Sequence, residues 1–236
     1  MLKCNGEIFI LKGKIKMKLK KLLTTVVSTM CAAVLALSMV SCGNEKSSSS
    51  SKTESSSSKV EVDESKSFTI ALYPEFAPET CENFEKLVKS GFYDGLIFHR
   101  VMEGFMAQGG GFTEKGTYKQ ASNINGEFAA NGFTKNTLSH TRGVVSMARA
   151  TDMNSGSSQF FICYNGNHTA SLDGQYAAFG KVTNGMEVVD DFLKLGVTVD
   201  QRGEASVPKS KIVILKAEMT DDDSEGHHQA KFYMSF

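Results

Sequence analysis

Short stretches in which hydrophobic and polar residues alternate recur along the middle of the chain, and each predicts a β-strand. The clearest covers residues 67–73, where Phe68, Ile70 and Leu72 would lie on one face of a sheet. We expect residues 60–62 to form a short strand that pairs with it. Comparable hydrophobic runs predict further strands at residues 97–102, 105–108, 144–148, 160–164, 177–182 and 211–219.

Two segments have the hydrophobic spacing of an amphipathic helix. The first begins at Pro78, a residue suited to a first turn, and ends before Gly91, which commonly follows a helix. The second covers residues 185–193. The positions expected to face the core are Cys81, Phe84, Leu87 and Val88 in the first, and Met186, Val189 and either Phe192 or Leu193 in the second. Many short strands with few helices predict a β-barrel or a β-sandwich, and periodicity alone leaves both open, although barrel closure would remove exposed strand edges.

The first 42 residues have the pattern of an export signal rather than of a folded domain. Residues 1–16 are polar and basic, a second basic segment starts at Met17, and residues 22–40 are mostly apolar. We expect Met17 to be the true first residue. The run ends at Cys42 in a sequence that resembles the lipobox of bacterial lipoproteins, by which Cys42 would become the lipid-bearing first residue of the mature protein. An uncleaved membrane helix is the alternative, since the apolar run is close to the length that spans a bilayer.

The composition changes sharply on both sides of the expected domain. Residues 43–59 are almost all serine with a few charged residues, which cannot bury a core and predict a flexible linker. We expect the folded domain over residues 60–220. Residues 221–236 begin acidic and include His227 and His228, and we expect a loose tail there, with metal binding by the two histidines as a minor alternative.

The overall composition narrows the class of protein. The 236 residues include 26 Lys and Arg and 26 Asp and Glu, so the formal charge is zero, and we expect no nucleic-acid partner. Hydrophobic residues make up 41%, enough for a packed core. No cysteine or histidine spacing indicates zinc, so we predict no metal site. We expect Cys81 to be a core residue rather than a redox centre, and whether it pairs with Cys163 stays open, because sequence does not show whether the fold brings them together.

Residues 98–111 gather the side chains of most chemical interest. Arg100 is permanently charged and presents five N–H donors in a planar fork. Phe105 and Met106 can wall an apolar pocket, and Gln108 can donate and accept hydrogen bonds at once. The three glycines that follow allow close backbone approach. Taken alone, the segment also fits an ordinary half-buried strand.

Three further segments give this one a context: residues 143–150, 157–162 and 172–182. In order and spacing, the four segments resemble the signature sequences of the cyclophilins, which are peptidyl-prolyl cis-trans isomerases. The resemblance runs from about residue 60 to residue 219. It implies a mainly β fold, a closed eight-stranded antiparallel barrel capped by two α-helices. It also implies an enzyme that rotates X–Pro peptide bonds without a cofactor.

The same resemblance implies roles for individual residues. Arg100 would be the catalytic residue that donates to the prolyl nitrogen, and Gln108 would hold a substrate carbonyl group. The implied substrate-binding residues are Phe105, Met106, Phe161 and Leu172 around the proline, Gln159 and the backbone at Ala148, Arg149 and Ala150 along the flanking peptide, and Tyr176. His99 would support the arginine from behind.

The chain departs from better-known cyclophilins at two positions. Tyr176 stands where many members have histidine, an exchange between aromatic residues that we expect to be tolerated. Ser171 stands where they carry a tryptophan that helps to hold cyclosporin. Serine offers neither the area nor the indole donor. We therefore expect weak cyclosporin binding with isomerase activity retained.

The expected partners are proline-containing peptides and exported proteins, met outside the cytoplasm by a lipoprotein anchored to the bacterial cell membrane through Cys42. The alternative is a non-catalytic chaperone or scaffold that binds proline-containing segments at the membrane surface. Other enzyme classes fit poorly, since the glycine run lacks the Gly-Lys-Ser/Thr of a phosphate loop and no Gly-x-Ser-x-Gly precedes a helix. We expect His140 and His168 to be loop residues.

Overall fold

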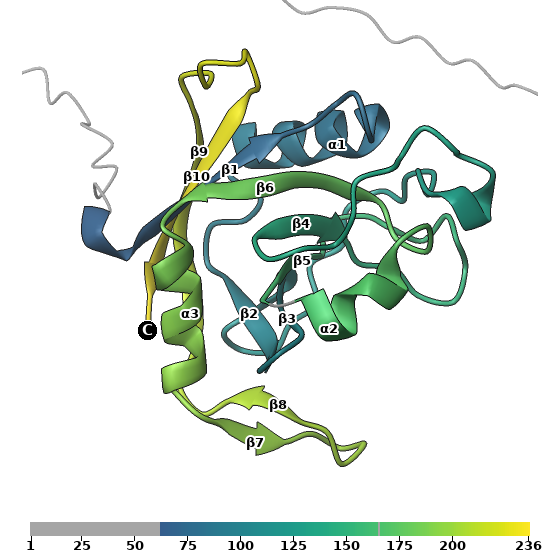
Figure 1. Cartoon of the computed structure of the whole chain (residues 1–236). Coiled ribbons are helices and arrows are strands. Elements are labelled where there is room, and N and C mark those ends of the chain that lie inside the picture. Colours follow the sequence, from purple (N-terminus) through teal and green to yellow (C-terminus); the bar gives the residue numbers. More distant parts are fainter. Residues whose placement is uncertain (1–61, 165) are drawn as a thin grey trace, which may run out of the picture. The chain divides into compact units, whose positions relative to one another are not determined.

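The computed structural model of the chain describes residues 62–164 and 166–236. Its main element is a closed barrel of eight antiparallel strands in the order β1-β10-β9-β2-β3-β5-β4-β6, closed by pairing of β6 with β1 (Figure 1). The strands are β1 Ser67–Leu72, β2 Leu96–Met102, β3 Met106–Thr113, β4 Val144–Met147, β5 Phe160–Cys163, β6 Ala178–Asn184, β9 Ile212–Thr220 and β10 Gln229–Ser235. The barrel expected from the resemblance is confirmed, and the sandwich left open by periodicity is excluded.

Two helices pack on the barrel, as predicted. Helix α1, Pro78–Lys89, packs against β6 and β9, and α3, Met186–Lys194, packs against β1 and β2. The remaining helical segments are short: α2 Gly166–Thr169 and the 3₁₀ turns Glu64–Lys66, Ala129–Asn131 and Ala170–Leu172. In the part of the chain that the structure describes, no helix is long and apolar enough to cross a membrane. A separate hairpin that the sequence pattern did not predict is formed by β7, Val197–Val199, and β8, Ala205–Pro208.

The prediction of a loose tail over residues 221–236 was wrong. Strand β10 lies inside the barrel wall between β1 and β9, with Phe232 paired to Phe68 and Ala230 to Ile70. The side chains that alternate toward the interior are fully or almost fully buried: Ala230, Phe232 and Met234. The folded domain therefore reaches residue 235 rather than ending near 220, because the eighth strand of the barrel comes from the C-terminus.

Of the partner strand predicted for β1 at residues 60–62, only the last residue is described. Both edges of β1 are taken, by β10 on one side and β6 on the other. Val62 belongs to no strand, and residues 60 and 61 lie outside the described residues. The polar segment that follows forms the turn Glu64–Lys66, in which the Asp63 carboxylate accepts a hydrogen bond from the Ser65 backbone N–H at 2.9 Å.

The two histidines before β10 have acidic partners. His227 Nδ1 lies 3.0 Å from Asp223 Oδ2, and His228 Nδ1 lies 3.1 Å from Glu85 Oε2 on α1. Among the described residues, no group of three or more histidine, cysteine and carboxylate side chains is placed to hold a metal ion. The first contact lies within the β9–β10 turn, and the second joins that turn to α1.

Cys81 and Cys163 are both free thiols. Cys81 is 4% exposed and faces the core, as predicted, and its thiol lies 3.3 Å from the Phe179 carbonyl oxygen. Burial raises the pKa of each thiol to about 12, so neither is a reactive thiolate at neutral pH.

A buried carboxylate anchors the long segment between β3 and β4. Glu127 is 4% exposed, and its two oxygens accept hydrogen bonds from the backbone N–H groups of Glu79 at 3.0 Å and Thr80 at 2.8 Å. These N–H groups belong to the first turn of α1, which has no partners for them within the helix. The anchor joins a loop to a helix that lies far from it in sequence.

A β-bulge in β2 sets the direction of the functional side chains. Phe98 and Val101 both face the core, and the register with β3 shifts between Phe98 and Arg100. One extra residue, His99, is accommodated there, so that Arg100 points away from the core. The His99 ring contacts Phe112 with 4.9 Å between centroids, and within the described residues its Nδ1 is buried without a hydrogen-bond partner.

Replacement of Phe232 tests the role of β10. The ring stacks on Phe68 with 5.3 Å between centroids and also contacts Phe84, Tyr93 and Phe160. We expect Phe232→Ala in the full chain to lower the free energy of unfolding by about 3–5 kcal/mol, measured by denaturant titration.

Lys231→Ala is the matched control on the same strand, because Lys231 contacts Glu64 at the surface and such pairs contribute about 1 kcal/mol or less. Equal small losses in the two variants would contradict the placement of β10 in the barrel wall.

A second prediction concerns His99 and pH. Burial, and then the charge of Arg100, lower the pKa of His99 to about 4, whereas in the unfolded chain it is about 6.5. At a pH between these two pKa values, the unfolded state binds a proton at His99 more readily than the folded state does. The contribution of neutral His99 to the free energy of unfolding is therefore fully present above pH 6.5 and is lost as the pH falls. From pH 7 to pH 5 the loss should be about 2 kcal/mol, and His99→Gln should remove that part of the pH dependence in urea titrations. The same pH dependence in both proteins would rule out a buried neutral His99.

Candidate active site

A cavity of about 610 Å³ opens on the outer face of β2, β3 and β5. It brings together nine of the residues predicted from the sequence: Arg100, Phe105, Met106, Gln108, Ala148, Arg149, Phe161, Leu172 and Tyr176. His99 also lines it. Two predicted residues are not in the lining, Ala150, which is exposed just beyond Arg149, and Gln159. Cys42, the predicted lipidation site, lies outside the described residues.

Strand register places the key side chains in one row. Arg100 on β2 pairs with Gln108 on β3, and Gln108 pairs with Phe161 on β5. Residues that pair directly across neighbouring strands point to the same face of a sheet. The charged fork, the amide and the aromatic ring therefore lie side by side although they come from three strands.

The floor of the cavity is a small hydrophobic cluster separate from the barrel core. Its buried members are Met106, Phe161, Cys163 and Leu172, and Met102, Phe105, Ala148 and Tyr176 pack around them. Phe161 and Tyr176 meet edge to face with 5.7 Å between ring centroids. An apolar floor next to a charged wall suits a ligand that combines an aliphatic ring with a peptide group.

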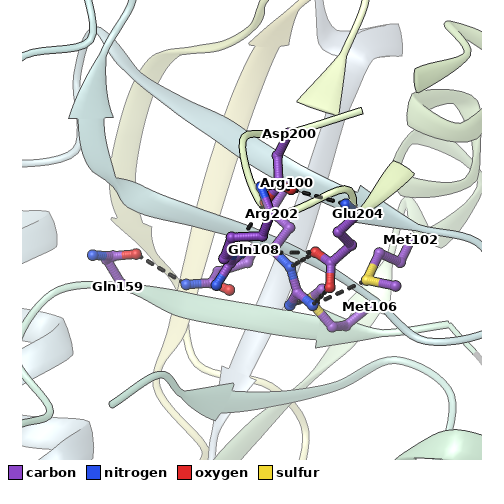
Figure 2. A network of polar contacts seen from close by, with 8 residues as sticks. All are labelled: Arg100, Met102, Met106, Gln108, Gln159, Asp200, Arg202 and Glu204. Atoms are coloured by element: carbon purple, nitrogen blue, oxygen red, sulfur yellow. Dashed lines mark hydrogen bonds and ion pairs between the residues drawn. The ribbon is translucent and has the colours of Figure 1, made fainter. Parts of the chain in front are cut away.

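Gln108 is held by Gln159. The Gln108 Nε2 donates to Gln159 Oε1 at 3.0 Å (Figure 2), so the second N–H and the carbonyl oxygen of Gln108 stay available. Gly111 makes room for this contact, because a Cβ there would come within 2.5 Å of Gln159 Cγ. Gln159 thus contacts Gln108 and does not itself line the cavity.

The guanidinium of Arg100 is paired with a carboxylate that the sequence analysis missed. Arg100 Nε donates to Glu204 Oε1 at 2.6 Å and Nη2 donates to Oε2 at 2.9 Å (Figure 2). The pair is partly buried, with 23% of the arginine and 29% of the glutamate side chain exposed. The hydrogen bonds from Arg100 lower the pKa of Glu204, so its carboxylate is ionised at neutral pH. The sequence signal for this hairpin is weak, since it consists of a three-residue alternation at Val197–Val199 followed by the turn residues Asp200 and Gly203.

His140 is more than a loop residue. Its ring is 2% exposed, with Nδ1 2.8 Å from Asp173 Oδ1 and Nε2 2.9 Å from Ser146 Oγ. Burial lowers the pKa of His140, so the ring is neutral, and the ionised Asp173 makes Nδ1 the donor and Nε2 the acceptor from Ser146. The arrangement of Asp173, His140 and Ser146 resembles the catalytic triad of a hydrolase. Ser146 is 0% exposed, however, so no substrate can reach it. Since His140 also stacks on Phe161 with 6.0 Å between ring centroids, the network supports the cavity floor.

The comparisons with known proteins agree with this geometry. Residues 57–219 match the family model described as cyclophilin type peptidyl-prolyl cis-trans isomerase/CLD. A peptidyl-prolyl cis-trans isomerase of Acinetobacter baylyi is 41% identical over 157 residues, which cover 64% of this chain and 78% of that protein. Peptidyl-prolyl cis-trans isomerase B of Bacillus subtilis is 47% identical over 116 residues, covering 49% of this chain and 76% of that protein.

A solved structure gives the same result for the fold. The crystal structure of a cyclophilin type peptidyl-prolyl cis-trans isomerase of Cryptosporidium parvum is similar with a TM-score of 0.50 and 26% identity, covering 72% of this chain and 91% of that one. The family match ends at residue 219, so β10 lies beyond it. By its sequence, its barrel and its relatives, this chain belongs to the cyclophilin-type peptidyl-prolyl cis-trans isomerase family.

Proposed function

We propose that this isomerase acts on X–Pro bonds of exported proteins, with Arg100 as its catalytic residue, while a lipid on Cys42 holds it at the bacterial membrane. The observation that carries the catalytic part is the position of Arg100 beside the apolar floor. Its Nη1 lies 3.7 Å from Met106 Sδ, and its Cζ lies 5.8 Å from the centre of the Phe105 ring. Charge and apolar surface thus face the same ligand.

Rotation about an X–Pro bond is slow because the amide has partial double-bond character, with a barrier of roughly 20 kcal/mol. A guanidinium N–H that donates to the prolyl nitrogen localises its lone pair and weakens that character. Met106, Phe161 and Leu172 would hold the proline ring, and the free N–H of Gln108 would hold a neighbouring carbonyl group. Rotation about the X–Pro bond by this route requires no nucleophile and no cofactor.

Arg100 alone does not supply the whole acceleration. A rate increase of about 10⁵ needs about 7 kcal/mol, whereas one charge-assisted hydrogen bond contributes about 1.5–3 kcal/mol. The remainder comes from binding the twisted peptide more tightly than either planar form. A floor of four packed apolar side chains and a fixed amide suits that task because it grips the ring and one carbonyl while the other part of the peptide turns.

Weak cyclosporin binding is part of the same proposal. Ser171 is exposed, and its hydroxyl group donates to the His168 carbonyl oxygen at 3.1 Å. A side chain of this size, occupied by a local hydrogen bond, offers little surface to a large cyclic peptide.

The proposed catalytic role predicts the effect of Arg100→Ala. In a protease-coupled proline assay kcat/KM should fall about 10- to 150-fold, the range that one charge-assisted hydrogen bond supports. Arg142→Ala is the control, because Arg142 is half exposed, pairs with Asp190 and is absent from the cavity lining. If Arg100→Ala keeps the full rate, the catalytic role of Arg100 is contradicted. If the wild type itself shows no rate above the uncatalysed reaction, the alternative of a non-catalytic chaperone or scaffold that binds proline-containing segments gains support.

The proposed anchor predicts the effect of Cys42→Ser. In a bacterial host that receives labelled palmitate, the full chain should take up label and fractionate with membranes, and Cys42→Ser should lose both properties. Cys31→Ser, within the same apolar run, should keep them. Membrane retention of unlabelled Cys42→Ser would favour an uncleaved helix, and a peptide from residues 1–16 in the unprocessed protein would contradict Met17 as the start.

A further inference from the structure

The hairpin formed by β7 and β8 lies beside β2 (Figure 1). It is a separate two-stranded sheet, outside the barrel. Asp200, Arg202, Ser206 and Val207 from this hairpin line the cavity next to Arg100. The hairpin is not needed to close the barrel, and it contains none of the site residues predicted from the sequence. Its contact with Arg100 therefore has no role assigned so far.

The turn of the hairpin is fixed by its own hydrogen bonds. The Asp200 carboxylate accepts from the backbone N–H of Arg202 at 2.8 Å, from that of Glu204 at 2.9 Å and from Arg202 Nε at 3.0 Å. The Asp200 backbone N–H in turn donates to the Glu204 carbonyl oxygen at 2.8 Å. Gly203 has a φ of +85°, a conformation that glycine adopts without strain. Glu204 is therefore presented on a pre-organised backbone.

A count of the Arg100 donors shows what this contact does. A guanidinium has five N–H bonds. Glu204 takes the Nε–H and one N–H of Nη2, and the other N–H of Nη2 faces Met102 Sδ at 3.0 Å. Nη1 is left next to Met106 on the cavity floor, and among the described residues its one polar contact is the long 3.7 Å approach to the Met106 sulfur. The carboxylate thus occupies one edge of the fork and leaves the other to a ligand.

We propose that Glu204 is a positioning residue, which fixes the Arg100 guanidinium so that Nη1 faces the proline bound in the cavity. The proposal rests on the catalytic role proposed above for Arg100. A bidentate pair fixes the plane of the guanidinium as well as its distance. An arginine side chain that is already ordered loses less conformational entropy when the twisted peptide forms its hydrogen bond.

The ion pair need not break for the reaction to occur. Glu204 binds the Nε and Nη2 edge, whereas the cavity floor lies at Nη1. Arg202, whose Nη2 is 3.9 Å from Glu204 Oε1, adds a second positive charge on the solvent side of the carboxylate. Its side chain is 74% exposed and also lines the cavity, and its charge offsets part of the negative charge of Glu204.

The test is Glu204→Gln in the full chain, assayed with a proline peptide by a protease-free method that separates kcat from KM. Glutamine keeps the size of the side chain but replaces one acceptor by an N–H that meets the arginine. We expect kcat to fall about tenfold with KM changed by less than about twofold, as for loss of orientation at the reacting atoms. Glu204→Asp, which keeps the charge, should restore part of the rate.

A double-mutant cycle separates positioning from a general structural effect. In an Arg100→Ala background, Glu204→Gln should have no further effect on kcat, because its effect passes through the guanidinium. Asp190→Asn, which removes an equal charge from the surface pair with Arg142, is the control and should match the wild type.

The other possible results of these assays contradict either the positioning role of Glu204 or the catalytic role of Arg100. An unchanged kcat in Glu204→Gln overturns the positioning role, and so does a kcat that rises, which would mean that the carboxylate competes with substrate for Arg100. An equal loss in the Arg100→Ala background would assign Glu204 a structural role only. If Arg100→Ala itself keeps the full rate, the proposed function fails first, and that result is distinct from failure of the inference about Glu204.

Discussion

The wall formed by β2, β3 and β5 separates two hydrophobic clusters, and the rest of the site depends on that separation. The aromatic core lies on one face, with Phe98 and Phe160, and the cavity floor lies on the other, with Met106 and Phe161. Strand alternation alone would give this division on β3 and β5. On β2 the bulge at His99 is needed as well, because it lets Phe98 and Val101 both face inward while Arg100 faces out. A one-residue slip in this register would move the guanidinium to the wrong side of the wall.

Closure of the barrel ties the site to distant parts of the chain. Strand β10 comes from the C-terminus and pairs with β1, near the start of the described residues. Non-local pairing of this kind carries a loop-closure entropy cost that grows with the length of the intervening chain. The cavity lies on the opposite side of the sheet order, around β3 and β5, so the strand that completes the barrel is distant in that order from the strands that line the cavity. Barrel closure and the cavity therefore involve different strands of one sheet.

Local patterns predicted much of the fold and most of the cavity. Both helices, most strands and nine of the cavity residues follow from hydrophobic spacing and from the resemblance of four short segments to a known family. What the sequence could not show are contacts between residues far apart in the chain. Glu204 lies 104 positions from Arg100, and Glu127 lies 47 positions from Thr80. A carboxylate in a polar segment reads as solvated, and only the fold reveals that it meets an arginine or a helix end.

The C-terminal strand shows the same limit in another form. Residues 229–235 do alternate, with Ala230, Phe232 and Met234 on one face, but the acidic and histidine-containing residues before them outweighed that short pattern. His140 is a comparable case, since its partners Asp173 and Ser146 come from a turn and a strand that only the barrel brings together. In both cases, polar residues nearby in the sequence indicate a surface position, whereas the structure buries the residue.

The most direct test of the central claim is a crystal structure of the chain with a bound proline-containing peptide. The account predicts the proline ring on Met106, Phe161 and Leu172, with Arg100 Nη1 at about 3 Å from the prolyl nitrogen and the Glu204 carboxylate still on the opposite edge of the fork. A peptide bound away from this floor, or an Arg100 side chain turned out of the cavity toward the hairpin, would contradict it.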